Sequence, residues 1–269
     1  MKKKNVDGGF TLVELLVAVA IIGVLSSFIF VGVSKVRIAA KMAREMAAGR
    51  SLITAYLTDA SDNHGLLMAG IDPDATATDK AGNSYPGYVA KRYPARLAPI
   101  LNWNFSGSVC VNESEAWADQ FYTATVSPAF GMNVTFVGGS FREPEPDPVR
   151  DAEKYGAFCI QRLLQADQPS KQMVFISARQ SGGGKNAETP GNFYVRSPYL
   201  KGRRWADKYD EDSSSLEWGN VHPRYHGKAV AVFLDGGVRT LNAKQVQDMR
   251  FWAKGAREAD DSEWTLRRE

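Results

Sequence analysis

Cysteine and histidine are scarce in this chain, whose 269 residues include two cysteines and three histidines. A structural zinc site needs four such ligands at close spacing, and here the two cysteines lie far apart. The sequence also lacks a nucleophile elbow, a complete phosphate-binding loop and a pair of carboxylates suited to acid–base catalysis. We therefore expect no metal, no cofactor and no enzymatic activity.

An excess of one charge is missing as well. The 33 basic residues nearly balance the 30 acidic ones, which gives a net charge of +3 at pH 7. Dedicated nucleic-acid binders carry a clear basic surplus, so we expect no nucleic-acid partner. With 44% hydrophobic residues, the chain can form one domain of about 200 residues with a proper core.

Charge is nearly absent from residues 10–33, which read FTLVELLVAVAIIGVLSSFIFVGV. At about 1.5 Å per residue, a helix over this run would be about 36 Å long, enough to cross a hydrocarbon core of about 30 Å. The lysines Lys2 to Lys4 precede the run and, by the positive-inside rule, keep the N-terminus in the cytoplasm. The sequence thus predicts a single-pass protein of the inner (cytoplasmic) membrane whose C-terminal domain is periplasmic or extracellular.

Glu14 is the one charged residue of this apolar run. A carboxylate in the bilayer core costs about 2.5 to 3.5 kcal/mol and usually has a partner and a function. The small residues Gly8 and Gly9 stand before the apolar run, whereas a secretory signal has them after it. A cut after Gly9 would leave the run on the mature chain and create an α-amino group on Phe10. That amine, or the same amine of a neighbouring subunit, is a candidate partner for Glu14.

Residues 9–14 follow a short basic leader and read Gly-Phe-Thr-Leu-x-Glu. This motif resembles the N-terminal signature of type IV pilins and type II secretion pseudopilins. It covers the first tenth of the chain. An ordinary signal anchor would explain the lysines and the apolar run, but not this motif.

The resemblance implies that a prepilin peptidase cuts between Gly9 and Phe10 and methylates the Phe10 amine. It further implies that Glu14 registers each subunit in a growing fibre by pairing with the Phe10 amine of its neighbour. The implied partners are an inner-membrane assembly platform with its ATPase, other pilin-like subunits in a homo- or hetero-polymer, and membrane lipid before assembly.

Residues 11–59 contain no proline, so we expect one helix over them. Its second half is amphipathic, with Lys35, Arg37, Lys41, Arg44 and Glu45 on the polar face. The predicted organisation is a cleaved leader (1–9), a transmembrane and fibre-core helix (10–33), an amphipathic continuation (34–60) and an extracytoplasmic domain (61–269). The predicted fold is α+β and pilin-like, with the long helix packed on an antiparallel sheet.

Further elements are predicted from local patterns. We expect strands at 109–111, 121–126, 133–137, 173–178 and 192–195, a hairpin of 228–234 with 238–241, helices at 151–165 and 245–252, and a frayed polar tail.

An Asp-Gly turn marks the predicted hairpin, because Asp235 and Gly236 supply the backbone conformation that tight turns require. His226 before the strand and Asp235-Gly236 after it resemble the C-terminal His…Asp-Gly motif of a pilin-like family with a large C-terminal domain. Residues 130–133, Phe-Gly-Met-Asn, resemble another element of that family. His226 and Asp235 would lie about 30 Å apart, so they cannot share a proton. We expect Asp235 to shape the turn and His226 to pack or form a hydrogen bond at the strand start.

Three other sequence features could indicate a disulfide, a metal site or a phosphate-binding loop. Cys110 and Cys159 can form one disulfide in an oxidising compartment, and two buried thiols are the alternative. The acidic residues Asp72, Asp74 and Asp79 could bind calcium. Because they lack the spacing of an EF-hand loop, we expect a solvated loop instead. The glycines of residues 182–184, followed by Lys185, lack the Walker spacing and predict a surface loop.

The sequence as a whole predicts a non-enzymatic structural subunit of a type IV pilus-like or type II secretion pseudopilus-like fibre. The alternative is a membrane-anchored extracytoplasmic module that binds a ligand or polysaccharide. For that function the chain would use exposed tryptophans, of which the candidates are Trp103, Trp117, Trp205 and Trp218.

Overall fold

The computed structural model describes residues 11–181 and 188–268, apart from the side chains of residues 24–32 and 188. The chain divides into two compact units, Met1–Lys41 and Met42–Glu269. The helix α1 (Leu12–Asp62) runs through both, which confirms the prediction of one uninterrupted helix. Within the described residues, no helix combines the length and the apolar character that crossing a membrane requires.

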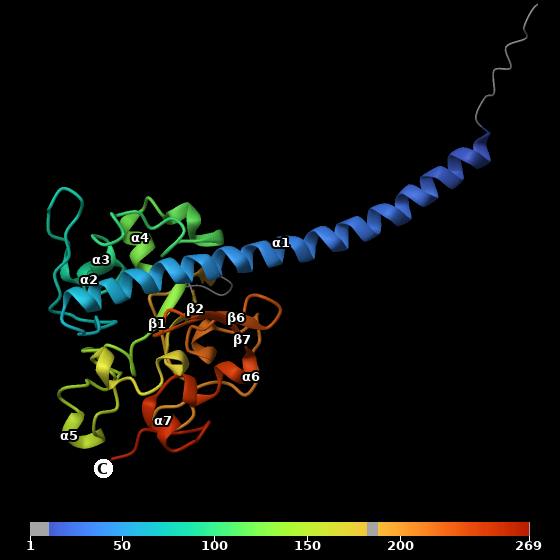
Figure 1. Ribbon diagram of the computed structural model, residues 1–269. Coiled ribbons are helices and arrows are strands. Elements are labelled where there is room, and N and C mark those ends of the chain that lie inside the picture. Colours follow the sequence, from blue (N-terminus) through green and yellow to red (C-terminus); the bar gives the residue numbers. More distant parts are fainter. Residues whose placement is uncertain (1–10, 182–187, 269) are drawn as a thin grey trace, which may run out of the picture. The chain divides into compact units, whose positions relative to one another are not determined.

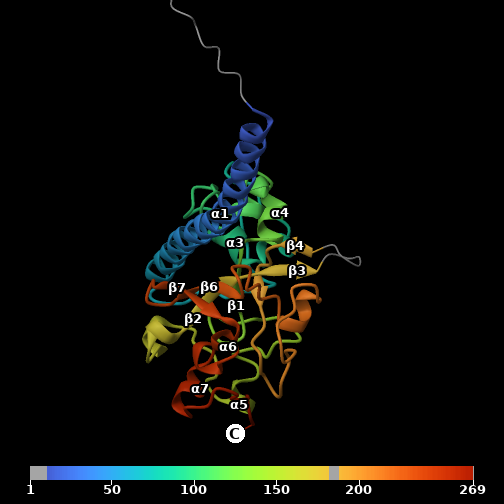
Figure 2. The ribbon, with the colours of Figure 1, turned by 90° about the vertical axis from the view of Figure 1, so that its right-hand side faces the viewer.

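The second unit is built on a five-stranded sheet, in the order β5-β1-β2-β6-β7. Figures 1 and 2 label β1, β2, β6 and β7 of this sheet. The strands β1 and β5 are parallel, and the other neighbours are antiparallel. The predicted α+β fold is therefore correct. The strands of this sheet are β1 (Phe130–Asn133), β2 (Met173–Ser177), β5 (Tyr194–Val195), β6 (Lys228–Phe233) and β7 (Val238–Asn242).

Short elements fill the rest of the unit. The strands β3 (Arg179–Ser181) and β4 (Glu188–Pro190) pair in a separate two-stranded sheet. The helices are α2 (Gly87–Ala90), α3 (Tyr93–Leu97), α4 (Phe121–Val126), α5 (Ala152–Tyr155), α6 (Ala243–Val246) and α7 (Lys254–Glu258). The 3₁₀ turns are η1 (Asn112–Trp117), η2 (Leu163–Gln165), η3 (Pro169–Lys171), η4 (Ser215–Trp218) and η5 (Met249–Phe251).

From Met42 onward, α1 covers one face of the sheet (Figure 1). Its buried stripe includes Leu52, Ile53 and Tyr56, at the three- and four-residue steps of a helix face. Gly49 lies in the same stripe, where a Cβ atom would come within 2.8 Å of the Val232 side chain on β6. Gly49 therefore permits the close approach of helix and sheet.

The opposite face of the sheet carries the main hydrophobic core. Successive side chains of a strand point to opposite faces, and on β6 Val232 meets α1 whereas Ala231 and Phe233 enter this core. The core is closed by residues of α6, η5 and α7, with Trp218 and Trp252 fully buried in it. The sheet is thus an inner layer with helical cover on both sides.

Glu45 interrupts the apolar stripe of α1 and is completely buried. Its carboxylate accepts hydrogen bonds from Ser177 Oγ, at 2.5 Å, and from the Tyr225 hydroxyl, and it forms an ion pair with Arg224, whose Nη1 lies 3.8 Å away. We call these four residues the Glu45 cluster. The prediction that Glu45 lies on the solvated face is wrong, because the buried stripe passes through positions 45, 48, 49, 52, 53 and 56.

The Glu45 cluster offsets the desolvation of its charge with hydrogen bonds and an opposite charge. Burial, and then the charge and hydrogen bond of Glu45, raise the pKa of Tyr225 well above its usual value. Tyr225 therefore keeps its proton and remains a donor to Glu45. Because Ser177 belongs to β2 and Glu45 to α1, the cluster joins the helix to the sheet.

Several predicted elements differ from the structure. Residues 121–126 form helix α4, in which Phe121 stacks on Tyr85 with ring centroids 4.1 Å apart, and not a strand. The expected helix at 151–165 stops at Tyr155, since Gly156 takes a φ of 65°. Residues 109–111 were expected to form a strand, but they contain only an isolated β-bridge, between Cys110 and Ser106.

The sheet region follows the predictions more closely. The strand expected at 173–178 and the hairpin of 228–234 with 238–241 are both present. The strand expected at 133–137 is wrong, because β1 ends at Asn133 and residues 134–136 form a turn. The neighbouring strand β5 occupies the end of the one expected at 192–195. The tail is not frayed, because it forms α7 and Leu266 is buried in the core.

Cys110 and Cys159 are free and buried, so the predicted disulfide is absent and the alternative of two buried thiols is correct. Cys159 lies in the main core, whereas the Cys110 N–H donates to the Phe105 carbonyl, 2.8 Å away, in the segment between α3 and α4. Burial raises the pKa of both thiols, that of Cys110 to about 12. The two cysteines thus occupy different packing environments.

Replacing Glu45 with glutamine should lower the free energy of unfolding by about 3 kcal/mol, because Arg224 loses its buried counter-charge. Tyr225→Phe removes one donor and should cost about 1 kcal/mol. Urea unfolding of the detergent-solubilised full chain measures both. The matched control is Glu153→Gln, which changes an exposed carboxylate on α5 and should leave stability unchanged. A Glu45→Gln variant as stable as the parent would contradict the role of the cluster.

Neither thiol should react with iodoacetamide while the protein is folded, because burial withholds both sulfur atoms and disfavours the reactive thiolate. After unfolding, mass spectrometry should show two added groups without prior reduction. If the two additions required a reductant, the cysteines would be bridged and the arrangement described here would be wrong.

Candidate assembly site

The helix α1 begins with a reciprocal pair of residues, Thr11 and Glu14. Glu14 Oε2 accepts hydrogen bonds from the Thr11 N–H and from Thr11 Oγ1, each at 2.9 Å, and the Glu14 N–H donates to Thr11 Oγ1 at 3.2 Å. This is a capping box, in which each side chain satisfies a backbone N–H of the other residue. Thr11 is therefore the N-cap and a partner of Glu14. This partner was not predicted, although the spacing Thr-x-x-Glu indicates it.

The capping box uses one oxygen of Glu14. Among the described residues, none donates a hydrogen bond to Glu14 Oε1. The carboxylate can therefore accept a further donor without giving up its role at the helix start. Gly9 and Phe10, the predicted cleavage and methylation residues, lie outside the described residues, so the pairing of Glu14 with a Phe10 amine stays a prediction.

Large apolar side chains surround the first turns of α1. Leu12 is 79% exposed and Val13 is 68% exposed, and the exposed set continues with Leu15, Leu16, Val17, Val19, Ile21 and Ile22. These positions cover every side of the helix and not a single stripe, a pattern typical of a helix surrounded by protein or lipid. A continuous apolar surface of this kind marks a contact region.

The C-terminal hairpin places its motif residues at opposite ends of β6. Asp235 Oδ1 accepts the Gly237 N–H at 2.8 Å, and Gly236 takes a φ of 86°. These two residues form the turn between β6 and β7, as predicted. His226 is exposed in the preceding turn with a φ of 50°. Of the two roles expected for it, packing or a hydrogen bond at the strand start, packing is therefore wrong. The structure does not bring His226 and Asp235 together.

The acidic loop residues bind their own backbone. Asp72 Oδ1 accepts the Asp74 N–H at 3.1 Å, and Asp79 Oδ1 accepts the N–H groups of Ala81 and Asn83 at 2.8 Å. Hydrogen bonds from Asn83 hold the pKa of Asp79 below its usual value. Within the described ranges, no three His, Cys, Asp or Glu residues form a group that could hold a metal ion. The glycine-rich run 182–185 lies outside these ranges.

The tryptophans considered for ligand binding are largely structural. Trp205 and Trp218 are buried in the main core, and their Nε1 atoms donate to the carbonyls of Arg196 and Lys208, each at 3.0 Å. Trp103 is partly buried and donates to the Thr78 carbonyl at 3.0 Å. Trp117 is also partly buried. Trp205 and Trp218 therefore pack in the core, which is the commoner role of tryptophan, and offer no surface to a ligand.

Comparison with known proteins adds one finding at the N-terminus. Residues 4–30 match the family model described as the prokaryotic N-terminal methylation motif. No curated protein and no solved structure matches the chain. The match supports a type IV pilin-like or pseudopilin-like protein and fits a membrane-anchored pilin precursor.

Proposed function

We propose that this chain is a non-enzymatic structural subunit of a type IV pilus-like or type II secretion pseudopilus-like fibre. The proposal depends on one observation, that one oxygen of Glu14 has no donor among the described residues, at the start of an exposed apolar helix. The match of residues 4–30 to the methylation motif supports it. Prepilin peptidase would cut between Gly9 and Phe10 and methylate the new amine.

The mechanism is physical. Before assembly, residues 10–33 cross the inner membrane, with the lysines of the leader on the cytoplasmic side. An ATPase-driven platform then extracts the helix and packs it among those of other pilin-like subunits. The Phe10 amine of one subunit donates to the free oxygen of Glu14 in the next, which neutralises a charge in apolar surroundings.

The Glu45 cluster connects this helix to its globular domain. Because Glu45 and the apolar residues after it are buried against the sheet, withdrawal of the helix would also move the domain. The domain therefore enters the fibre with the helix that carries it. In this proposal the N-terminal turns of α1 contact other subunits, and the turns from Glu45 onward attach the helix to its own domain.

A binding module is the second candidate function. The burial of Trp205 and Trp218 argues against the tryptophan surface first considered for it. A pocket lined by Lys91, Arg92 and Arg142, near the exposed Tyr88 and Tyr122, favours a binding module. Because this pocket lies on the globular domain, it is compatible with the fibre role.

Mass spectrometry of the protein purified from membranes should find an N-terminus at methylated Phe10. The control is the same protein made in cells without prepilin peptidase, which should keep residues 1–9. An intact leader in cells that have an active peptidase would contradict the proposal.

Two substitutions separate the charge of Glu14 from its capping role. Glu14→Gln keeps a side-chain acceptor for Thr11 but removes the charge, whereas Glu14→Asp keeps the charge on a side chain too short for a regular capping box. If the charge guides assembly, Glu14→Gln should reduce incorporation into sheared filaments by about tenfold, and Glu14→Asp should reduce it less. Both variants must first be shown to be trimmed. Equal incorporation of Glu14→Gln and the parent would contradict the assembly role of the charge.

A further inference from the structure

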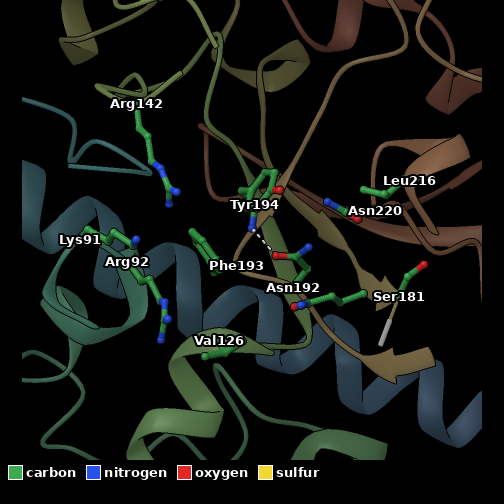
Figure 3. Close-up of a pocket in the computed structure, with 11 residues that line it drawn as sticks. Lys91, Arg92, Val126, Arg142, Ser181, Asn192, Phe193, Tyr194, Leu216 and Asn220 are labelled. Atoms are coloured by element: carbon green, nitrogen blue, oxygen red, sulfur yellow. Dashed lines mark hydrogen bonds between the residues drawn. The ribbon is translucent and has the colours of Figure 1, made fainter. Parts of the chain in front are cut away.

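A pocket of about 300 Å³ opens on the second unit, between the end of α2, α4 and the segment that leads into β5 (Figure 3). Its lining includes Lys91, Arg92, Arg142, Asn192 and Asn220. A volume of this size suits a small ligand or one unit of a larger one. None of the residues described as lining the pocket is acidic.

The three cations come from two separate segments. Figure 3 shows the side chains of Lys91 and Arg142 extending toward one another. Burial and the charges of Arg142 and Arg92 lower the pKa of Lys91. Within the described part of the chain, no carboxylate forms an ion pair with any of the three. An anion in the pocket would relieve this repulsion.

Two buried donors of the pocket are unused. Arg92 is 7% exposed and Asn220 is 1% exposed, yet Arg92 Nε and Asn220 Nδ2 donate no hydrogen bond within the described residues. A buried donor without an acceptor costs about 1 to 3 kcal/mol. Neither atom is in contact with solvent, so a ligand would reach them only if these side chains moved, and the case for binding depends on Lys91 and Arg142.

A row of aromatic rings extends from the pocket to the surface. Tyr88 and Tyr122 are more than half exposed, with ring centroids 6.1 Å apart. The Arg92 guanidinium lies 5.0 Å from the Tyr122 ring and 5.6 Å from the Phe193 ring. The Phe193 and Tyr194 ring centroids are 5.0 Å apart. Phe193 and Tyr194 are half-buried, and Arg92 lies between the two pairs of rings. The exposed pair of Tyr88 and Tyr122 beside the pocket indicates a binding surface.

We propose that this pocket and the row of rings bind an acidic sugar chain, with one carboxylated residue in the pocket. The carboxylate would meet Lys91 and Arg142, and the sugar hydroxyls would form hydrogen bonds with the amide and hydroxyl side chains that line the pocket. Neighbouring sugar rings would lie on Tyr122 and Tyr88. A single-stranded nucleic acid also combines charge with stacking, but its backbone needs a long basic groove, and this chain has a net charge of +3.

Isothermal titration of the detergent-solubilised full chain tests the proposal. The probe is a hexamer of α-1,4-linked galacturonic acid, and its neutral counterpart is maltohexaose. The acidic hexamer should bind with an affinity that falls as salt increases, and the neutral hexamer should not bind. Lys91→Gln and Arg142→Gln should each weaken binding about tenfold, and Tyr88→Ala should also weaken it. Arg162→Gln, at an exposed arginine outside the pocket, should have no effect.

Several results would overturn the proposal. The first is that the galacturonate hexamer does not bind at millimolar concentration. The second is that maltohexaose binds with the same affinity as the galacturonate hexamer. The third is that Lys91→Gln and Arg142→Gln leave the affinity unchanged. Tighter binding of a thymidine oligonucleotide, lost in the same two variants, would assign the pocket to nucleic acid. Circular dichroism of every variant confirms that each loss reflects binding and not unfolding.

Discussion

The buried carboxylate of Glu45 is the charge around which the attachment of α1 to the sheet is organised. Ser177 and Tyr225 donate to it, and Arg224 supplies an opposite charge. A charge at this depth is stable only with such partners, so strand β2 and the segment before β6 must meet α1 in a fixed position. Gly49 adds the close contact with β6. Polar and steric constraints therefore fix the same helix face.

Two carboxylates of α1, those of Glu14 and Glu45, differ in how their hydrogen-bonding capacity is used. Glu45 is enclosed by its own domain, whereas Glu14 is exposed and uses one oxygen in the capping box with Thr11. The first carboxylate holds the helix in the subunit, and the second has capacity left for a partner from outside. In the proposed fibre this difference separates the attachment of the domain from the registration of subunits.

Sequence patterns predicted the elements that depend on local chemistry. A long run without proline indicated α1, and the Asp235-Gly236 turn indicated the β6–β7 hairpin. Sequence patterns failed where contacts between distant segments determine the local structure. Residues 121–126 favour a strand by composition but form α4, where Phe121 stacks on Tyr85. Glu45 was assigned to solvent because its three partners are distant in sequence. The row from Tyr88 to Tyr194 likewise joins segments that no local pattern connects.

In the proposed fibre, the Glu14 carboxylate of one subunit accepts a hydrogen bond from the Phe10 amine of the next. Solid-state NMR of fibres assembled from two populations tests it directly, with ¹⁵N on the Phe10 amine in one and ¹³C on the Glu14 carboxylate in the other. The account predicts magnetisation transfer between the populations, from a nitrogen and a carboxylate within about 4 Å. Ordered fibres that show no such transfer would contradict it.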